Sequence, residues 1–334
     1  METTVSVVIP TRDRLALLRE AVASVLAQDL PSWELIVVDD DSSDGTSDWV
    51  AGLADVRVRG VRIEGHVERS AARNRGLDEA GAPTVLFLDD DDLLSPSGLQ
   101  RLWHALDRVP ESVAAFGAKE VFDGTGHRKR IPHPRMQLVR CVWDDVMAGW
   151  MFVSGQVLLR TEAVRAAGGW DEQLVMAEDQ DLWLRVPGLR PAILVPSVVL
   201  QQRTRAEGVN AWDVEEKVRD RVVNGLSAAD RPRAARLIEA RRHLRAAGVA
   251  FEEERFGDAT KELVGAAKAA PWLLTSPIWG PQLLSSLVKA GAAAVLPGSA
   301  GVRARSAVKG MRTRLSRNPI EPGVRPIGRD APKE

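Results

Sequence analysis

The sequence predicts an α/β fold with a mainly parallel sheet, followed by a mostly helical region. Over the first hundred residues, short β-rich runs alternate with segments whose apolar residues recur at helical spacing. Acidic residues directly follow two of these runs, at residues 39–41 and 89–92. From about residue 212 to residue 270 the chain is rich in Ala, Arg and Glu, with leucines and phenylalanines at helical spacing.

Four β-rich runs predict the strands of the N-terminal half. They span residues 5–9, 35–38, 56–63 and 85–88. The segments between them predict helices over residues 11–28, near residues 44–46 and over residues 68–80, and a further helix from residue 95 or 97 to about residue 109. We expect Thr11 to cap the first helix, because its hydroxyl can accept a hydrogen bond from a free backbone N–H.

Beyond residue 110 the periodicity is weaker. It predicts strands over residues 113–122 and 157–159, separated by a basic loop over residues 123–135. A helix is expected from residue 161 to the glycine pair 168–169, and a short one over residues 179–186. Residues 233–271 resemble one helical hairpin of the tetratricopeptide type, and a single pair is too short for a solenoid.

Composition excludes several classes of protein. With 45 basic and 46 acidic residues, bulk charge indicates no nucleic-acid binder. Hydrophobic residues make up 45% of the chain, enough for a sizeable core. The single cysteine, Cys141, excludes an internal disulfide and a multi-cysteine metal site, and favours a reducing cytoplasm. Residues 301–334 carry nine basic and three acidic residues, so a basic tail follows an acidic body.

The sequence indicates no signal peptide and no membrane span, since the longest apolar stretch, residues 283–297, is interrupted by Lys289. We therefore expect a cytoplasmic protein, either soluble or peripheral on the cytoplasmic face of the membrane. Residues 272–317 combine Trp272, Trp279 and several leucines with a later basic run. Two interpretations follow: a peripheral membrane contact, or, as we favour, a last helix packed on the body before a disordered tail.

The two acidic runs follow apolar strands, at the edge of an open α/β sheet where ligands bind. Adjacent carboxylates repel one another unless a cation neutralises them, and oxygen ligands suit Mg²⁺ or Mn²⁺ bridging to a diphosphate. A solvated acidic turn is the alternative for either run alone. An acidic pocket of the response-regulator type and a haloacid-dehalogenase-type phosphatase are rivals, although the phosphatase pattern would need a Thr that does not follow Asp89.

Six motifs together carry a resemblance to a known family. They read VSVVIPTRDRLALLREAVASVLAQ, ELIVVDDDSSDGT, RSAARNRGLDEAG, VLFLDDDD, SGQVLLRTEAVRAAGGWDE and AEDQDLWLR, in that order. Over about residues 4–205 the chain resembles a family 2 glycosyltransferase of the GT-A fold. The resemblance implies inverting transfer of a sugar from a nucleoside diphosphate to an acceptor hydroxyl.

The resemblance also implies residue roles. Asp39 would face the nucleotide base with Arg73 supporting it, Asp89 would lie near the ribose, and Asp91 would hold the metal on the diphosphate. Which of the four carboxylates at residues 89–92 contact the metal stays open. The residues expected to bind the nucleotide sugar are Pro10, Thr11, Arg12, Asp39, Asp41, Arg73, Asp89 and Asp90.

On the acceptor side, the resemblance implies that Asp179 is the general base and that Trp170, Asp171 and Glu178 lie beside it. Alternatives stay open for several of these residues. Asp179 could be a helix N-terminal residue favoured by the macrodipole, and Arg73 could be a surface residue of an exposed helix. Trp170 and Trp183 could be core residues or a platform for the acceptor.

The chain departs from the family pattern after the base helix. Family members often place a His there, whereas this chain has Arg203 and Arg205, so the third metal ligand is in doubt. This departure raises the alternative of a catalytically impaired nucleotide-sugar-binding or scaffold protein. His66, in the donor-side loop, is expected to be solvated. A sugar nucleotidyltransferase is disfavoured because IPTRDR lacks glycine, and a processive synthase because its Gln-x-x-Arg-Trp motif is absent.

The predicted organisation is a GT-A catalytic domain over residues 1–207, a helical region over residues 208–300 and a basic, flexible tail over residues 301–334. The resemblance favours a UDP- or dTDP-sugar as donor. The acceptor is expected to be a carbohydrate, a lipid-linked or a small molecule, and no nucleic-acid partner is expected.

Overall fold

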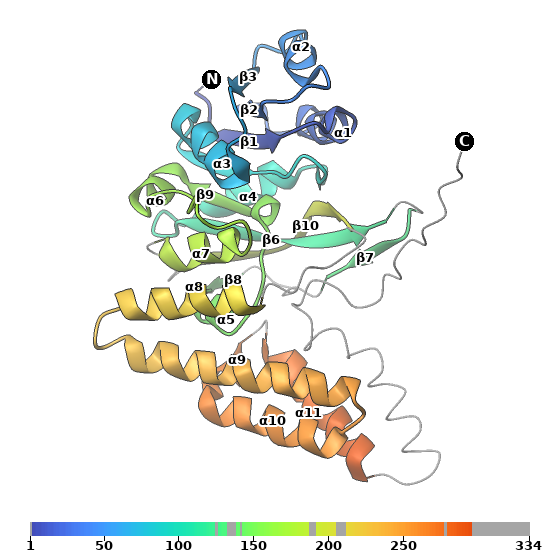
Figure 1. The fold of residues 1–334 in the computed structure, drawn as a ribbon, viewed down its shortest axis with the longest axis vertical. Helices are drawn as coiled ribbons and strands as arrows, with labels where there is room; N and C mark the ends of the chain where they lie inside the picture. Colours follow the sequence, from blue (N-terminus) through green and yellow to red (C-terminus); the bar gives the residue numbers. More distant parts are fainter. Residues whose placement is uncertain are drawn as a thin grey trace. The chain divides into compact units, whose positions relative to one another are not determined.

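A computed structural model describes residues 2–123, 126–131, 138–140, 142–186, 192–204, 212–276 and 279–295. The chain forms two compact units (Figure 1). The first comprises Met1–Val146, Phe152–Arg203 and Val214–Val222, and the second comprises Met147–Met151, Thr204–Asp213 and Val223–Glu334. The predicted basic tail, residues 301–334, lies outside the described residues.

The first unit is built on a ten-stranded sheet with the order β3-β2-β1-β4-β9-β6-β10-β5, in which β7 pairs with β6 and β8 with β10. Its strands are β1 (Val5–Thr11), β2 (Trp33–Asp40), β3 (Val58–Ile63), β4 (Thr84–Phe87), β5 (Leu93–Leu94), β6 (Ala114–Phe122), β7 (Arg128–Arg130), β8 (Leu138–Arg140), β9 (Val157–Arg160) and β10 (Ala192–Arg203).

The two halves of this sheet differ in strand direction. Strands β3, β2, β1 and β4 are all parallel, as predicted. The antiparallel strand β9 then lies between β4 and β6, and β6 pairs in parallel with β10. The carboxyl ends of β1 and β2 lie side by side, with Thr11 opposite Asp39. The acidic runs after β2 and β4 are thus brought to one edge of the sheet.

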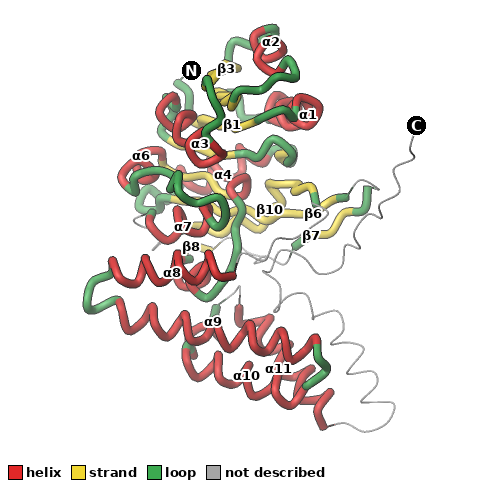
Figure 2. The backbone as a smooth tube through the Cα atoms, viewed as in Figure 1, coloured by secondary structure: helices red, strands yellow, loops and turns green. Residues whose placement is uncertain are grey.

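Helices cover both faces of the sheet (Figure 2). They are α1 (Leu15–Leu26), α2 (Thr46–Ala51), α3 (Glu68–Glu79), α4 (Gly98–Asp107), α5 (Trp143–Met147), the 3₁₀ helix η1 (Ser154–Gln156), α6 (Thr161–Ala166), α7 (Glu178–Arg185) and α8 (Trp212–Gly225). Residues of α5 and α8 are divided between the two units.

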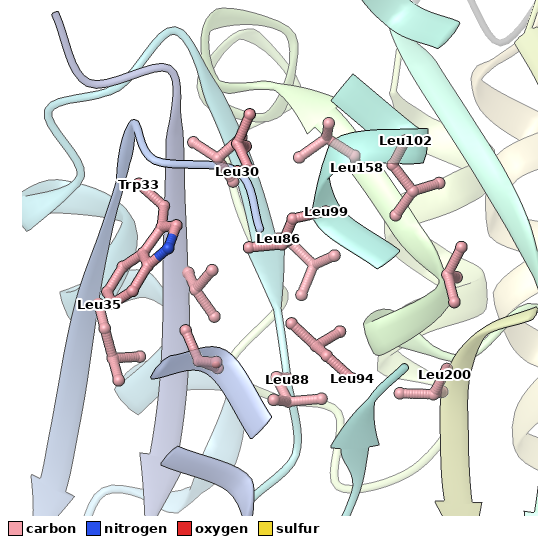
Figure 3. Packing of buried hydrophobic residues seen from close by; sticks show 14 of the residues in the cluster. Leu30, Trp33, Leu35, Leu86, Leu88, Leu94, Leu99, Leu102, Leu158 and Leu200 are labelled. Carbon is pink, nitrogen blue, oxygen red and sulfur yellow. The ribbon is translucent and has the colours of Figure 1, made fainter. Parts of the chain in front are cut away.

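Apolar side chains from strands and helices form a buried hydrophobic cluster in this unit (Figure 3). Leu86 of β4 and Leu158 of β9 are fully buried with Leu99 of α4. Helix α3 lies so close to β1 that a Cβ at Gly76 would be 2.2 Å from Val8 Cγ1. Glycine is therefore required there for the approach of the helix, and this contact fixes Arg73, one turn earlier, beside the sheet edge.

The predicted cap of the first helix is wrong. Thr11 is the last residue of β1, and its hydroxyl donates a hydrogen bond to Asp90 Oδ2 at 2.8 Å. Helix α1 begins at Leu15, whose N–H donates to Asp44 Oδ2 at 2.8 Å. The carboxylate that satisfies the start of this helix therefore comes from the loop after β2. Local sequence patterns do not indicate this carboxylate, because Asp44 lies 29 residues after Leu15.

The second half of the unit also departs from the expectation. The predicted basic loop over residues 123–135 contains strand β7, which pairs antiparallel with the end of β6. Strands β8 and β10 were not predicted, although β10 has twelve residues. Pro196 and Ser197 interrupt its apolar run, and its pairing with β6 shifts register between Val195 and Val198 and again before Leu200. This irregularity hides the strand from a period-2 pattern.

The second unit contains α9 (Arg231–Glu252), α10 (Phe256–Ala269), the 3₁₀ helix η2 (Pro271–Thr275) and α11 (Trp279–Val295). The hairpin predicted for residues 233–271 is confirmed as α9 and α10, which bury Leu244, Phe251 and Leu263. On α11, Leu284 and Val288 are 53% and 72% exposed. Among the described helices, none combines the length and apolar character needed to cross a bilayer.

Candidate active site

The acidic run after β2 is neutralised by groups of the protein itself. Asp39 accepts hydrogen bonds from the Ser42 N–H at 2.9 Å and from the Ser47 hydroxyl, and Arg62 lies 3.0 Å from it. Burial would raise the pKa of Asp39, but the hydrogen bonds from both serines and the Arg62 charge lower it below its usual value. Arg62 also pairs with Asp41 at 3.0 Å.

The middle residue of this run, Asp40, faces the start of α3. Its carboxylate accepts a hydrogen bond from the Val67 N–H at 2.9 Å and lies 2.6 Å from His66 Nδ1. His66 Nε2 lies 3.0 Å from Glu68. Hydrogen bonds to Asp40 and Glu68 raise the pKa of His66. His66 is exposed, as expected, and both of its ring nitrogens have carboxylate partners.

The acidic run after β4 is arranged differently. One carboxylate oxygen each from Asp89, Asp91 and Asp92 lies within 4.8 Å of the other two. Asp92 is buried, and burial together with the charges of Asp89 and Asp91 raises its pKa well above the usual value. Three converging carboxylates are a donor set that fits a hard divalent cation such as Mg²⁺ or Mn²⁺.

Asp90 turns toward β1 instead of joining this cluster. It accepts the Thr11 hydroxyl hydrogen bond and a second one from Arg14 at 2.9 Å, and burial raises its pKa. Arg14 also lies 3.3 Å from Asp91. Asp90 and Thr11 thus connect the ends of β1 and β4. The role in nucleotide-sugar binding expected for both residues stays a prediction.

Arg203, at the end of β10, braces the same acidic turn. Its backbone N–H donates to Asp92 Oδ1 at 2.9 Å, and its Nε donates to the Asp91 carbonyl at 3.2 Å. Its guanidinium packs over Phe122. The residue in the region where the family often has a His therefore touches the acidic turn through a guanidinium, which cannot ligate a metal. Arg205 lies outside the described residues.

Arg73 connects the acidic turn to the predicted base helix. It is buried, and its guanidinium lies 2.6 Å from Asp89 and 3.0 Å from Glu178. Burial disfavours its positive charge, but the two carboxylates raise the pKa of Arg73 above the usual arginine value. The ring of Trp170 lies 4.4 Å beneath the guanidinium. This geometry excludes the alternative that Arg73 is an exposed surface residue.

Asp179 is the second residue of α7. Ala177, just before the helix, has a left-handed φ of 61°, which turns the chain sharply into Glu178. Asp179 keeps part of its surface exposed and accepts a hydrogen bond from the Gln180 N–H at 2.7 Å. Its buried surroundings and the charge of Glu178 raise the pKa of Asp179 to about 7. A carboxylate with this pKa can accept a proton near neutral pH.

The two tryptophans on this side are core residues. Trp170 and Trp183 are 2% and 0% exposed, and their rings meet edge-on at 6.0 Å. Trp170 also packs edge-on against Phe87 at 5.0 Å. Burial leaves neither ring a face for a ligand, so the platform alternative is wrong for both. Asp171, by contrast, is partly exposed and pairs with Arg221 of α8 at 2.6 Å.

The structure thus divides the predicted site residues into two groups. Asp89, Glu178 and Asp179 lie around the guanidinium of Arg73, and Asp91 lies in the carboxylate cluster with Asp89. A second group, at the ends of β1 and β2, comprises Pro10, Thr11, Arg12, Asp39 and Asp41.

The sequence motifs did not indicate three arginines of the site, Arg14, Arg62 and Arg221. Asp92, which the sequence left open as a metal ligand, lies in the carboxylate cluster. Of the arginines, only Arg14 stands inside a quoted motif. The other two have their carboxylate partners 21 to 50 residues away, and no local signal marks them.

Comparisons with known proteins indicate the class to which this fold is similar. The family model of glycosyl transferase family 2 matches residues 6–163. A beta-1,3-glucosyltransferase of Campylobacter jejuni, named for a GalNAc(5)-diNAcBac-PP-undecaprenol substrate, is 39% identical over 100 residues, which cover 29% of this chain and 32% of that protein. The matches to the first curated relatives span 20–44% of those proteins' lengths.

Two solved structures are similar in fold. Residues 1–349 of S. aureus TarS in complex with UDP-GlcNAc have a TM-score of 0.61 at 18% identity, covering 92% of this chain and 90% of that one. A mannosyltransferase of Pyrobaculum calidifontis in complex with GDP-Man and Mn²⁺ has a TM-score of 0.53 at 18% identity, covering 92% and 80%. The fold is therefore the GT-A fold that the resemblance implied. The match of residues 6–163 to the family 2 model supports the resemblance drawn from the sequence motifs.

Proposed function

We propose that this protein is an inverting glycosyltransferase that moves a sugar from a nucleoside diphosphate to an acceptor hydroxyl. The observation that carries the proposal is the buried Arg73, whose guanidinium pairs with the partly exposed Asp89 of the carboxylate cluster and with the buried Glu178 next to Asp179. In this proposal, one arginine contacts both the cation site for the leaving diphosphate and the glutamate next to the base for the attacking hydroxyl.

On the donor side, Asp91 is the proposed metal ligand, with Asp89 and Asp92 supplying further oxygens. A bound Mg²⁺ or Mn²⁺ would offset the negative charge that grows on the leaving diphosphate. The nucleotide would lie against Pro10, Thr11, Arg12, Asp39, Asp41, Arg73, Asp89 and Asp90. The proposed donor is a UDP- or dTDP-sugar; one neighbour in fold was solved with UDP-GlcNAc and another with GDP-Man.

On the acceptor side, Asp179 is the proposed general base, and Asp171 and Glu178 lie beside it. Asp179 takes the proton of the acceptor hydroxyl as that oxygen bonds to the anomeric carbon. The bond from this carbon to the diphosphate oxygen breaks on the opposite face, which inverts the configuration. The pKa near 7 suits this role, since the carboxylate is ionised at neutral pH and still basic enough to accept a proton.

The proposed acceptor is lipid-linked, because the Campylobacter relative is named for an undecaprenol diphosphate substrate.

We also propose a peripheral contact with the cytoplasmic face of a membrane. Exposed Leu284 and Val288 lie one turn apart on α11, and the segment that follows in sequence carries nine basic residues. Flotation with anionic vesicles tests this contact: Leu284→Ser/Val288→Ser should release the protein, and equal binding by both forms would refute it.

The experiment that tests the function is nucleotide-sugar turnover by Asp179→Asn. We expect kcat to fall about 10²- to 10⁴-fold with donor binding retained. In the unaltered protein, turnover should rise with pH through about 7, as Asp179 loses its proton, and the variant should lose this dependence. Glu162→Gln, an exposed carboxylate on α6, is the matched control and should behave as the unaltered protein.

Stability supplies an independent readout for the same variant. A carboxyl group whose pKa is raised by folding costs stability once it ionises, so the cost is full above pH 7 and vanishes toward pH 4. Asp179→Asn should therefore melt at a higher temperature than the unaltered protein at pH 8, with a smaller difference at pH 5. Undiminished transfer would remove Asp179 as the base, and donor binding without transfer or hydrolysis would indicate a binding protein.

A further inference from the structure

Helix α8 reaches the acceptor side of the site through one residue, Arg221. Its guanidinium lies 2.6 Å from Asp171 and also pairs with Asp181. The Asp181 side chain is fully buried and receives a second hydrogen bond, from Arg185 Nε at 2.7 Å. Removing a partner from a fully buried carboxylate is costly, so this arrangement resists rearrangement.

The two carboxylates held by Arg221 bracket the segment 171–177 and the start of α7. Asp171 stands at the beginning of that segment, and Asp181 lies on α7 two residues after the proposed base. Within the segment, Val175 is 60% exposed, so its surface is open to a ligand. One guanidinium therefore joins the entry to this segment to the helix that carries Asp179. Ser70 and Asn74 of α3 also donate hydrogen bonds within the segment, to the Leu174 carbonyl and to Glu172.

Other contacts hold the backbone just before the segment. Asn74 of α3 donates to the Trp170 carbonyl at 2.9 Å and accepts from the Trp170 N–H at 2.8 Å. Arg185 donates to the Gly169 carbonyl at 2.8 Å. Both residues belong to elements that the sequence motifs already include. Arg221 differs, because it comes from helix α8, which follows all six motifs in the sequence. The part of α8 that contains Arg221, Val214–Val222, belongs to the first compact unit.

We propose that Arg221 is a positioning residue for the acceptor: by clamping Asp171 to Asp181, it holds segment 171–177 and Asp179 in the arrangement that receives the acceptor hydroxyl. This inference rests on the proposed function, since it assigns segment 171–177 to the acceptor. It makes α8 part of the acceptor site. Both ion pairs of Arg221 are with acceptor-side residues, Asp171 and Asp181, and not with the donor-side strands β1, β2 and β4.

The kinetic test compares Arg221→Gln with the unaltered protein. We expect the KM for the acceptor to rise about tenfold, because small misplacements of reacting groups are costly, while the KM for the donor changes less than about twofold. Arg221→Lys should recover part of the loss, since a lysine provides a single charged group where arginine forks to two carboxylates. Arg75→Gln is the control: Arg75 is equally exposed at 50% and pairs with Glu79 at 2.7 Å.

Hydrogen exchange tests the clamp without turnover. The amides of residues 171–177 should exchange faster in Arg221→Gln, with those of β1 unchanged. Asp171→Asn, whose amide oxygen can still accept from the Gln173 N–H, should add little to Arg221→Gln if the two residues act as one unit.

Unchanged exchange in segment 171–177, or equal rises in both KM values, would overturn the clamp. Absence of transfer by the unaltered protein in the same assay would instead refute the proposed function, so the two failures are distinguishable.

Discussion

The two acidic runs at the sheet edge have nearly the same sequence and opposite electrostatics. Residues 39–41 meet Arg62, His66, two serine hydroxyls and backbone N–H groups, and the pKa of Asp39 is lowered. In residues 89–92, three carboxylates face one another, and the pKa of Asp92 is raised well above its usual value. Three arginines reach this second run: Arg14 contacts Asp90 and Asp91, and Arg203 donates to Asp92 and to the Asp91 carbonyl. Arg73 is shared between Asp89 and Glu178, which lies outside the run.

This difference shows that a run of aspartates does not by itself identify a metal site. The deciding property is whether the fold supplies enough positive charge and enough donors for each carboxylate. In the first run, the protein itself supplies the positive charges and hydrogen-bond donors that the carboxylates need. The second concentrates negative charge where a divalent cation would lower the energy of the folded protein, so the two runs should respond differently to substitution and to added metal.

The largest expected difference lies in the response to metal. Asp91→Asn should lower transfer about 10³-fold, since a charge-stabilising group at the leaving diphosphate is lost. It should also abolish the rise in melting temperature that Mn²⁺ adds in the presence of UDP. Asp41→Asn, in the first run, should keep the Mn²⁺-dependent rise. Loss of the metal response in both variants would erase the distinction between the two runs.

The next effect concerns Arg73, the buried arginine that pairs with Asp89 of the second run. Arg73→Gln leaves Asp89 and Glu178 without their shared guanidinium, and we expect the free energy of unfolding to fall by about 3–5 kcal/mol. Urea denaturation followed by tryptophan fluorescence measures this change. A loss below about 1 kcal/mol would mean that these carboxylates do not depend on Arg73.

The smallest effect concerns the cation of the first run. Arg62 is 42% exposed, and ion pairs at such positions contribute about 0.2–1 kcal/mol. Arg62→Gln should therefore lower the free energy of unfolding by no more than about 1 kcal/mol, and less at high salt. The same urea denaturation measures it beside Arg73→Gln. Equal losses in the two variants would contradict the difference in burial on which the comparison rests.

The sequence predicted those parts of the fold in which consecutive segments of the chain each show the periodicity of one strand or one helix. Strands β1, β2 and β4 with the helices between them show clear periodicity, and their order brings the acidic runs to one edge. The helical hairpin α9–α10 was predictable for the same reason. Strand β10 was not, because Pro196 and the two register shifts break its pattern.

The site was predictable in its motif residues and unpredictable in their partners. The resemblance indicated Asp89, Asp91 and Asp179, but not that Thr11 would bond to Asp90 instead of capping α1. It also left Trp170 undecided between core and ligand contact, and burial decides for the core. Arg62 and Arg221 reach their carboxylates from separate elements, so only the folded arrangement shows which charges are neutralised.

The shared guanidinium of Arg73 has a consequence for recombination between related enzymes. Its two carboxylates come from segments 89 residues apart in the chain, one beside the proposed diphosphate site and one beside the proposed base. A chimera joined between α4 and α7 would keep its charge balance only if both parents carry the same Arg–Asp–Glu set. Specificity for donor and acceptor can therefore be exchanged as separate modules only between parents that match at these three positions.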